Sequence, residues 1–313
     1  MNYFSNQHRY NSLDVYLKTK FKAKVFKIAL NASLTCPNRD GTISKRGCLF
    51  CSDVGSGEYA GHPKESLQQQ FKKGQANLHK KWPNGKYIVY FQANTNTYAT
   101  LSHLKQLFET AINLDPNIVA LSIATRCDTL PNDVLDFLAI INQKLPVWIE
   151  LGLQSSNQDT MDKMNLGYTI STFKNAVQRI KERNIEVIAH IINGLPNETK
   201  DVMINTVEFL NNLNINGIKI HSLYLVKNSE LGQAYLKQPF PLLTLTNYVD
   251  IVCEQLAKLS PNIIIHRING DPPLDFFIAP NWALKKFVIM NEIDKRMKDL
   301  NYYQGCKYEE KAY

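Results

Sequence analysis

Short apolar runs alternate with helical patterns along most of this chain, and this repeat constrains the fold more than any other feature. Six runs rich in β-branched residues are strand candidates: 25–30, 87–91, 118–123, 147–151, 186–192 and 217–223. Between them, residues 101–113, 132–143, 172–183 and 200–213 carry apolar side chains every three or four positions. From the second run on, successive runs begin about thirty to forty residues apart, the length of a βα unit. The repeat therefore predicts six parallel strands in a barrel or a doubly wound sheet.

Three more elements are expected after the sixth run: a helix over 244–259, a strand over 262–266 and a final helix over 282–299. The 313 residues are 44% hydrophobic and 20% charged, which suits one large α/β domain with additions at its ends. We therefore expect a basic N-terminal segment over 1–24, a barrel over 25–225 and a C-terminal extension over 226–313 that caps the barrel.

A loop after the first strand candidate contains three cysteines. Cys36, Cys48 and Cys51 are spaced C-x11-C-x2-C among Pro, Gly and Arg residues. Three thiolates can hold a 4Fe-4S cluster by three of its irons and leave the fourth iron open, whereas a cluster with four cysteines mostly transfers electrons. The spacing therefore predicts a cluster that binds and transforms a ligand.

Zinc and disulfide bonds are the alternatives for this loop. Zinc needs four nitrogen or sulfur ligands, and His62 is the histidine within reach that would complete a Cys3His set. Disulfides are disfavoured because the chain begins Met-Asn-Tyr-Phe-Ser without a signal peptide and has no apolar run that would span a bilayer. We expect a cytoplasmic protein without membrane contact. Cys127, Cys253 and Cys306 lack partners at ligand spacing and are expected to be ordinary free thiols.

Basic residues flank the cysteine loop on both sides in the sequence. The formal net charge is +8. Residues 1–27 hold six basic residues and one acidic residue, a local charge of +5, and residues 64–86 have the same balance. A polyanionic substrate is one explanation, and a solvated lysine surface that keeps the protein soluble is the other.

Polar side chains follow most of the predicted strands, where active sites of parallel barrels lie. Residues 92–97 read Gln-Ala-Asn-Thr-Asn-Thr, Thr125 and Arg126 follow the third run, and residues 152–155 read Gly-Leu-Gln-Ser. The fifth run contains His190 and leads into Asn-Gly-Leu-Pro at 193–196. Any one of these is also explained by turn formation, and His190 alone by a hydrogen-bonded core histidine. Their repetition at equivalent places favours a shared site.

These segments resemble the radical S-adenosylmethionine superfamily, and within it the group that contains the YhcC and YtqA proteins. The resemblance covers nearly the whole chain and includes a cysteine spacing longer than the commoner C-x3-C-x2-C. It is carried by residues 9–11, 34–42, 47–51, 90–98, 151–155, 190–196 and 266–271. The resemblance implies a partial (β/α)6 TIM-type barrel with the cysteine loop at its mouth.

The resemblance also implies the cofactors. A 4Fe-4S cluster on Cys36, Cys48 and Cys51 would chelate the amino and carboxylate groups of S-adenosylmethionine. One-electron reduction would then cleave a carbon–sulfur bond to give a 5′-deoxyadenosyl radical, which takes a hydrogen atom from the substrate. The electron would come from an external one-electron reductant of the flavodoxin or ferredoxin type.

The family's cofactor contacts map onto the polar segments of this chain. Asn94 and Thr95 stand where the family holds the methionine amino group, and Gln154 and His190 where it contacts ribose. Backbone groups of three consecutive residues would meet adenine, and two residues at the end of the third strand would lie beside the cofactor: Asn193, Gly194 and Leu195, and Thr125 and Arg126.

One segment departs from the family pattern. Relatives often read Asn-Arg-Gly-His where this chain has Asn165, Leu166, Gly167 and Tyr168. An arginine contact expected at position 166 is therefore missing, so cofactor binding either tolerates the loss or uses another group, for which Arg126 is the candidate.

The resemblance to YtqA implies a transfer RNA substrate. Such proteins are linked to removal of the carboxymethyl portion of a 5-carboxymethylaminomethyl group on the wobble uridine, which leaves 5-aminomethyluridine for a separate methyltransferase. Phosphate contacts are expected from a row of alternating lysines on an exposed segment, namely Lys18, Lys20, Lys22 and Lys24.

Other residues and other functions stay open. Five aromatic residues interleave with the N-terminal lysines, and we expect them to be core residues more than base-stacking ones: Tyr3, Phe4, Tyr10, Tyr16 and Phe21. Residues 270–273 and 281–282 are expected on the substrate side. The alternatives are a radical enzyme that acts on a small metabolite or a protein, and a non-enzymatic cluster or zinc protein that binds RNA.

Overall fold

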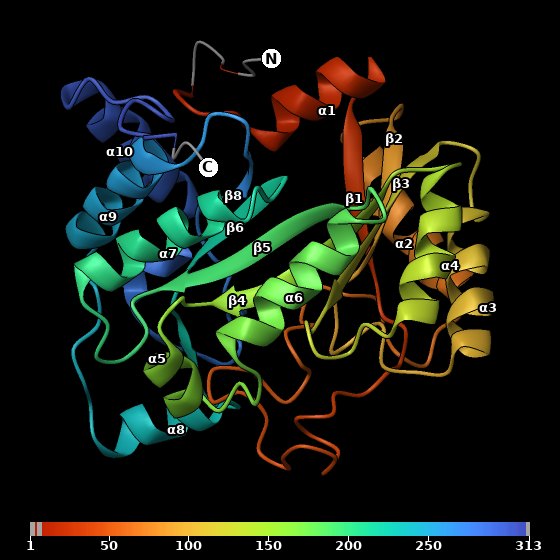
Figure 1. Cartoon of the computed structure of the whole chain (residues 1–313), viewed down its shortest axis with the longest axis horizontal. Helices are drawn as coiled ribbons and strands as arrows, with labels where there is room; N and C mark the ends of the chain where they lie inside the picture. The colour runs from red at the N-terminus through yellow and green to blue at the C-terminus, as the bar shows by residue number, and fades with distance from the viewer. Residues whose placement is uncertain (1–3, 5–7, 311–313) are drawn as a thin grey trace.

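Seven parallel strands form one curled sheet in the computed structural model, which describes residue 4 and residues 8–310. Tyr3 lies outside the described residues. The strand order is β1-β2-β3-β4-β5-β6-β8, with β1 and β8 at the two edges (Figure 1). The strands are β1 (Val25–Leu30), β2 (Lys86–Phe91), β3 (Ile118–Thr125), β4 (Val147–Gln154), β5 (Glu186–Asn193), β6 (Gly217–Ser222) and β8 (Ile264–Arg267).

The sheet confirms the predicted partial barrel. All six predicted strands are present in parallel register, because each is a short β-branched run followed by a crossover that returns the chain to the same end of the sheet. A seventh strand, β8, pairs with β6 and comes from the segment that we expected to cap the barrel. The division at residues 24 and 225 stays a prediction, but the C-terminal segment contributes to the main sheet itself.

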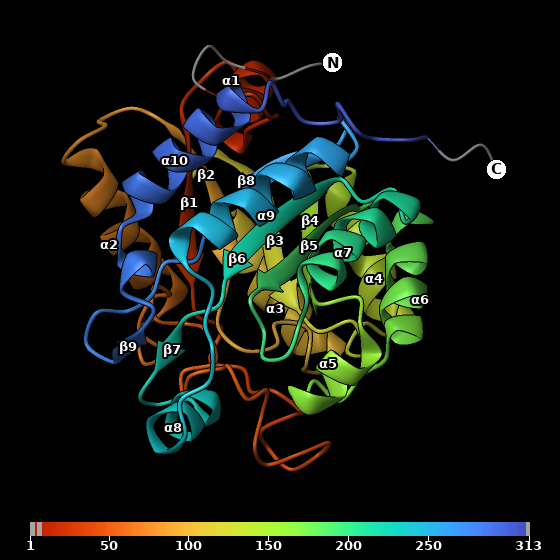
Figure 2. The ribbon, with the colours of Figure 1, turned by 90° about the vertical axis from the view of Figure 1, so that its left-hand side faces the viewer.

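Helices cover the outer face of the sheet, where α2, α3, α4, α6 and α7 pack against the strands (Figure 2). No helix among the described residues is long and apolar enough to cross a membrane. The helices are α1 (Leu13–Phe21), α2 (Leu67–His79), α3 (Leu101–Ile112), α4 (Asn132–Asn142), α5 (Gln158–Lys163), α6 (Ile170–Lys181), α7 (Lys200–Asn212), α8 (Glu230–Lys237), α9 (Leu245–Lys258) and α10 (Lys286–Asp299).

Several helices start where the sequence provides a capping side chain. Thr169, Thr199 and Thr244 each accept a hydrogen bond from the backbone N–H three residues on, at the starts of α6, α7 and α9. The final helix begins later than predicted because residues Asn281–Leu284 form a separate 3-10 turn, η1. A two-stranded sheet of β7 (Leu225–Val226) and β9 (Phe277–Ala279) lies outside the barrel.

The N-terminal segment differs from the exposed segment with a row of lysines that we predicted. It forms helix α1, and Leu17 packs on the inner side of the barrel at the amino ends of the strands. Its neighbours in this cluster come from five strands and are all buried: Val25, Ile88, Ala120, Trp148 and Ile188. Helix α1 therefore closes the end of the barrel opposite the cysteine loop (Figure 1).

The predicted row of lysines is wrong in geometry. Lys18 and Lys20 are two positions apart on a helix, about 200° around its axis, so they point to different sides. The Nζ atoms of Lys18 and Lys24 lie 2.6 and 2.5 Å from Asp14 carboxylate oxygens, and that of Lys20 lies 3.3 Å from Glu186. Lys22 caps α1 with a left-handed backbone (φ 53°). RNA contact by these lysines stays a prediction, now placed on the closed end of the barrel.

Candidate active site at the carboxyl ends of the strands

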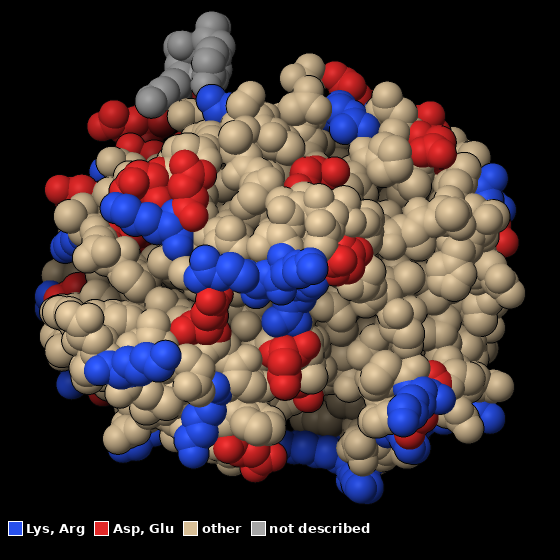
Figure 3. All heavy atoms as spheres, turned by 90° about the horizontal axis from the view of Figure 1, so that it is seen from below, with Lys and Arg blue, Asp and Glu red and all other residues tan. Residues whose placement is uncertain are grey.

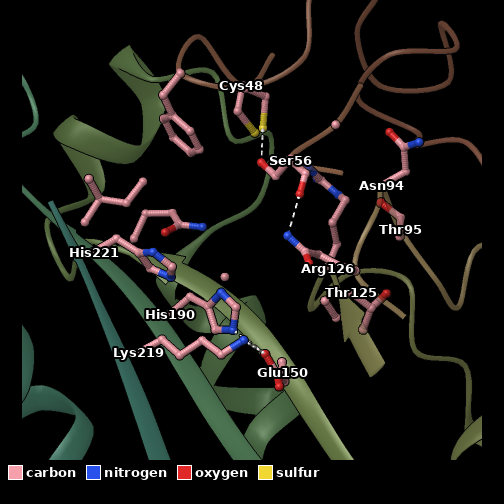
Figure 4. Close-up of a pocket in the computed structure, with 18 of the residues that line it drawn as sticks. Cys48, Ser56, Asn94, Thr95, Thr125, Arg126, Glu150, His190, Lys219 and His221 are labelled. Carbon is pink, nitrogen blue, oxygen red and sulfur yellow. Dashed lines mark hydrogen bonds and ion pairs between the residues drawn. The ribbon is translucent and has the colours of Figure 1, made fainter. Parts of the chain in front are cut away.

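The cysteine loop lies over the carboxyl ends of the strands, where Cys36, Cys48 and Cys51 line one cavity of about 250 Å³. The loop is tied to the segment after α5. Asn165 Nδ2 donates to the Gly47 carbonyl (2.6 Å), and the Leu49 N–H donates to the Met164 carbonyl (3.0 Å). Figure 4 shows Cys48 on the loop side of the cavity and the strand residues facing it. The loop therefore presents its three thiols to a shared space, as the prediction required.

The thiols differ in acidity. A hydrogen bond between Cys48 and Cys51 raises the pKa of Cys48, where burial adds to the effect, and lowers the pKa of Cys51 to about 7.

No three metal-ligating side chains among the described residues are close enough to hold a single ion. His62 lines a different cavity, where its Nδ1 accepts the Lys64 N–H at 3.3 Å. The zinc alternative needed that ring beside the thiols, so its placement does not support a Cys3His site.

Asn94 and Thr95, after β2, line the same cavity. Asn94 has a left-handed backbone (φ 58°), and its Nδ2 donates to the Leu34 carbonyl at 3.1 Å. A side chain at Gly55 would collide with the Asn94 amide, so glycine is required for this close approach. The buried hydroxyl of Thr95 has no partner among the described residues. Such an atom implies a partner that the chain itself does not supply, which fits a bound polar ligand.

Thr125 and Arg126 stand at the end of β3, between the cysteine loop and the sheet (Figure 4). The Thr125 hydroxyl is 2.6 Å from that of Thr97. Arg126 donates two hydrogen bonds to Asp128 (2.9 and 2.7 Å), and its guanidinium lies 4.7 Å from the ring centre of Tyr168. Although burial opposes it, the Asp128 carboxylate raises the pKa of Arg126 above its usual range. Arg126 therefore stays cationic beside the thiols.

Gln154 and His190 also reach the cavity, whereas the adenine segment largely does not. Gln154 adopts φ 67° at the end of β4 and His190 lies on β5. The Asn193 amide instead exchanges hydrogen bonds with the buried Gln255 (2.7 and 2.9 Å). The three adenine candidates, Asn193, Gly194 and Leu195, lie outside the cavity lining, so a role for their backbone stays a prediction.

A layer of polar residues inside the barrel was missed by the sequence analysis. Each of the first five strands places a polar side chain two residues after the apolar cluster under α1, which is the period of an inward-facing strand position. Strands β6 and β8 add two more. We call these seven residues the polar layer: Lys27, Tyr90, Ser122, Glu150, His190, Lys219 and His266. The alternation within the strand runs was the signal that would have revealed it.

Glu150 is the centre of the polar layer and is fully buried. Its Oε1 accepts from Lys27 Nζ (2.7 Å) and the Ser122 hydroxyl (2.6 Å), and its Oε2 accepts from His190 Nε2 (2.7 Å) and from Lys219 Nζ. Burial alone would raise the pKa of Glu150, but the two lysines hold it well below its usual range. Burial lowers the pKa of His190 to about 4, so this imidazole is neutral at physiological pH.

A second cavity of about 580 Å³ opens between the edge strands β1 and β8 and adjoins the first. Tyr90, Lys219 and Arg267 line both cavities. On the face that carries the loops, acidic and basic side chains are interspersed and do not form one basic surface (Figure 3). The cavity beside the thiols and the lateral cavity therefore meet at the level of the polar layer, where residues line both.

Comparisons with known proteins match this arrangement. A family model described as the Radical SAM superfamily matches residues 38–210, and one for the Radical SAM C-terminal domain matches residues 215–299. The chain is 41% identical over 303 residues to the uncharacterized protein YtqA of Bacillus subtilis, covering 97% of this chain and 94% of that protein. It is 32% identical over 284 residues to protein YhcC of Escherichia coli, covering 90% of each.

Two more distant similarities were found. A segment of 74 residues is 36% identical to a probable threonylcarbamoyladenosine tRNA methylthiotransferase of Methanocaldococcus jannaschii, covering 23% of this chain and 17% of that protein. The solved structure of an archaeal Methanocaldococcus infernus Elp3 superposes with a TM-score of 0.64 at 13% identity. That match covers 90% of this chain and 64% of the other, and at this identity it supports the fold alone.

Proposed function

Because this chain belongs to the radical SAM superfamily, we propose that it modifies the wobble uridine of transfer RNA. The family uses a 4Fe-4S cluster and S-adenosylmethionine, and the chain is a radical SAM enzyme. The proposed reaction oxidises the carbon between the amine and the carboxylate of a 5-carboxymethylaminomethyl group by two electrons, with S-adenosylmethionine as the oxidant. Addition of water would then release these two carbons as glyoxylate and leave 5-aminomethyluridine. When bound and reduced by one electron, these cofactors supply a 5′-deoxyadenosyl radical.

In this proposal the chain's own residues bind and position the reactants. Cys36, Cys48 and Cys51 would hold the cluster by three of its irons. The unpartnered Thr95 hydroxyl and the Asn94 amide line the cavity and would bind the amino-acid end of S-adenosylmethionine. The polar groups for ribose come from β4 and β5, namely Gln154 and His190, and His190 is fixed by its hydrogen bond to Glu150. The helices and the apolar cluster under α1 exclude water from the other end of the barrel.

The observation that carries the proposal is the pair of adjoining cavities. The cavity at the thiols is about 250 Å³, and the lateral one of about 580 Å³ gives a base with a long substituent a path toward the first. A base must leave its stack before an enzyme can act on the substituent, so an open side of the barrel suits an RNA substrate. The short match to a probable threonylcarbamoyladenosine tRNA methylthiotransferase supports the same substrate class.

Partners and location follow as parts of the proposal. Radical SAM enzymes need an electron donor, and we expect one of the flavodoxin or ferredoxin type. A cytoplasmic location stays a prediction. Of the alternatives, a non-enzymatic RNA-binding protein is disfavoured by membership of an enzyme family, whereas a small-metabolite or protein substrate is the other possible outcome of the test.

The test compares the modified nucleosides of transfer RNA, by mass spectrometry, from cells with and without the gene. Loss of the gene should cause 5-carboxymethylaminomethyluridine to accumulate, with loss of aminomethyl and methylaminomethyl forms. The wild-type gene should restore the profile and a Cys48→Ala gene should not. An unchanged profile, in cells without a redundant pathway, would refute the substrate and leave a radical enzyme with a different one.

A further inference from the structure

We propose that the polar layer binds the carboxylate of the substrate, with Lys219 and Lys27 as its cationic contacts. The identity of the ligand rests on the proposed function, because the 5-carboxymethylaminomethyl group ends in a carboxylate with one negative charge. The site itself rests on the charges, the hydrogen bonds and the cavities of the polar layer.

The polar layer carries one positive charge that nothing in it neutralises. Lys27 and Lys219 face a single carboxylate, that of Glu150, which leaves a charge of +1 when both lysines are protonated. The neighbouring Arg267 does not lower this charge, because its Nη2 lies 3.0 Å from the Asp271 carboxylate, which also pairs with Lys286. An uncompensated charge in a buried place is costly, so an anion that enters the layer is stabilised there.

Glu150 accepts from both lysines but has no acceptor site left for their remaining N–H groups. Its two oxygens accept four hydrogen bonds, from Lys27, Ser122, His190 and Lys219, which fills the usual capacity of a carboxylate. The Lys219 ammonium has three N–H groups and gives one to Glu150 and one to the Tyr90 hydroxyl (3.1 Å). Within the described residues, Nδ1 of His266 is buried without a partner. A second carboxylate would supply the acceptors that the layer lacks.

A bound anion would also change the protonation of the polar layer. Burial lowers the pKa of Lys219 to about 7, although Glu150 opposes the effect. Burial also lowers the pKa of His190 and of His266, so neither imidazole adds to the charge count near pH 7. A carboxylate beside Lys219 would favour its charged form and raise its pKa again.

The linings of the two cavities locate the place where a carboxylate would bind. Lys27 and His266 line the lateral cavity, Glu150 and His190 line the cavity at the thiols, and Lys219 lines both. A carboxylate held at Lys219 therefore lies where the cavities adjoin. Figure 4 shows Lys219 and Glu150 at the strand side of the cavity, across from Cys48. The carbon atoms next to the carboxylate would then lie near the place where the two cavities adjoin.

The test measures the binding of two nucleosides to the reconstituted enzyme with S-adenosylmethionine present, by isothermal titration calorimetry. One is 5-carboxymethylaminomethyluridine, and the other is its methyl ester, which lacks the charge. We expect the wild-type enzyme to bind the acid at least about tenfold more tightly than the ester, the usual scale of a charge-assisted contact. Lys219→Met should remove this preference.

Two further variants distinguish loss of the carboxylate contact from a folding defect. Lys27→Met removes a more accessible member of the layer and should reduce the same preference. Lys73→Met removes an exposed lysine of the lateral cavity that pairs with Glu65, outside the polar layer, and should leave the preference intact. Equal binding of acid and ester, or an equal preference in wild type and both layer variants with unchanged thermal midpoints, would overturn the subsite.

A separate probe distinguishes failure of the subsite from failure of the proposed substrate. Binding of N-acetylglycine and of its neutral amide is followed by ligand-observed NMR. Binding of the acid alone, lost in Lys219→Met, supports a carboxylate subsite even if neither nucleoside binds, and the uridine would then be the wrong substrate. Nucleosides that bind without regard to charge, together with no binding of N-acetylglycine, would reject the subsite while leaving the RNA substrate standing.

Discussion

Arg126 shows how a single residue acquires its role from its surroundings. Asp128 holds its guanidinium by two hydrogen bonds, and Tyr168 covers it at 4.7 Å from the ring centre. Leu166, at the position where relatives often carry arginine, is fully buried in the core. Leu166 cannot supply a cation, so cofactor binding either tolerates the loss or uses another group, for which Arg126 is our candidate because it lines the cavity at the thiols.

We predict that Arg126→Leu weakens the binding of S-adenosylmethionine about tenfold, because a charge-assisted contact to its carboxylate is lost. Equilibrium dialysis against the reconstituted protein measures this, and iron content should not change. The matched control is Arg183→Leu, which removes an arginine that pairs with Asp136 on the outer surface (2.7 Å). Equal affinities in wild type and Arg126→Leu would exclude the substitute role.

The three loop cysteines are predicted to act together as cluster ligands. Replacing Cys36, Cys48 or Cys51 by alanine should prevent stable incorporation of the cluster, because a 4Fe-4S cluster on two thiolates is poorly held. Iron and sulfide analysis after anaerobic reconstitution measures the loss. Cys306→Ala, which removes a partly exposed thiol near the C-terminal end, is the control and should keep a full cluster. Retention of a full cluster in the Cys48→Ala protein would contradict the assignment.

At the scale of elements, α1 acts as the base of the barrel. Leu17 is its buried residue, and the apolar side chains that it covers come from five different strands. The open edge between β1 and β8 is placed beside a cavity, whereas the amino ends of the strands are closed by this helix. The amino ends of the strands thus contribute to stability, whereas the candidate site lies at their carboxyl ends.

We predict that Leu17→Ala lowers the free energy of unfolding by about 2–5 kcal/mol, the range for a buried leucine that leaves a cavity. Denaturant unfolding followed by circular dichroism measures the change. Lys18→Ala, on the same helix but exposed and paired with Asp14, should cost little. A loss as small as that of Lys18→Ala would mean that α1 does not contribute to the core in solution.

At the scale of the whole molecule, buried ionisable groups make stability depend on pH. Burial lowers the pKa of His190 to about 4, and those of His221 and His266 fall below 6.5 for the same main reason. Between pH 6.5 and 4 the unfolded chain therefore binds more protons than the folded one, so stability decreases as pH falls. Below about pH 4.5 the lowered pKa of Glu150 acts in the same direction.

We predict that the thermal unfolding midpoint falls between pH 7 and pH 5, and that His190→Gln makes this fall shallower. Glutamine keeps an N–H donor for Glu150 but does not titrate. Differential scanning fluorimetry under anaerobic conditions measures the slope, with iron content checked at each pH. His103→Gln changes an exposed histidine on α3 and should leave the slope as in wild type. Identical slopes in wild type and His190→Gln would contradict the linkage.

The features of the fold that depend on local sequence patterns could be predicted without the structure. Short β-branched runs with periodic helices between them specify parallel strands, and a rule of parallel sheets then brings Asn94, Thr125 and Gln154 to one end. The cysteine loop was visible because its ligands are close in the chain. For this reason the partial barrel and the group of residues around Cys36, Cys48 and Cys51 were predictable.

Only the tertiary structure decided the contacts between distant residues. Glu150 meets Lys219 across 69 positions and Lys27 across 123, and the Asn193 side chain pairs with Gln255 instead of facing the cavity. Lys18 and Lys20 lie in the helix that buries Leu17. A strand of the C-terminal segment pairs with β6 and extends the main sheet. Such pairings depend on which strand becomes whose neighbour and which side chains face inward together, and no local periodicity encodes that information.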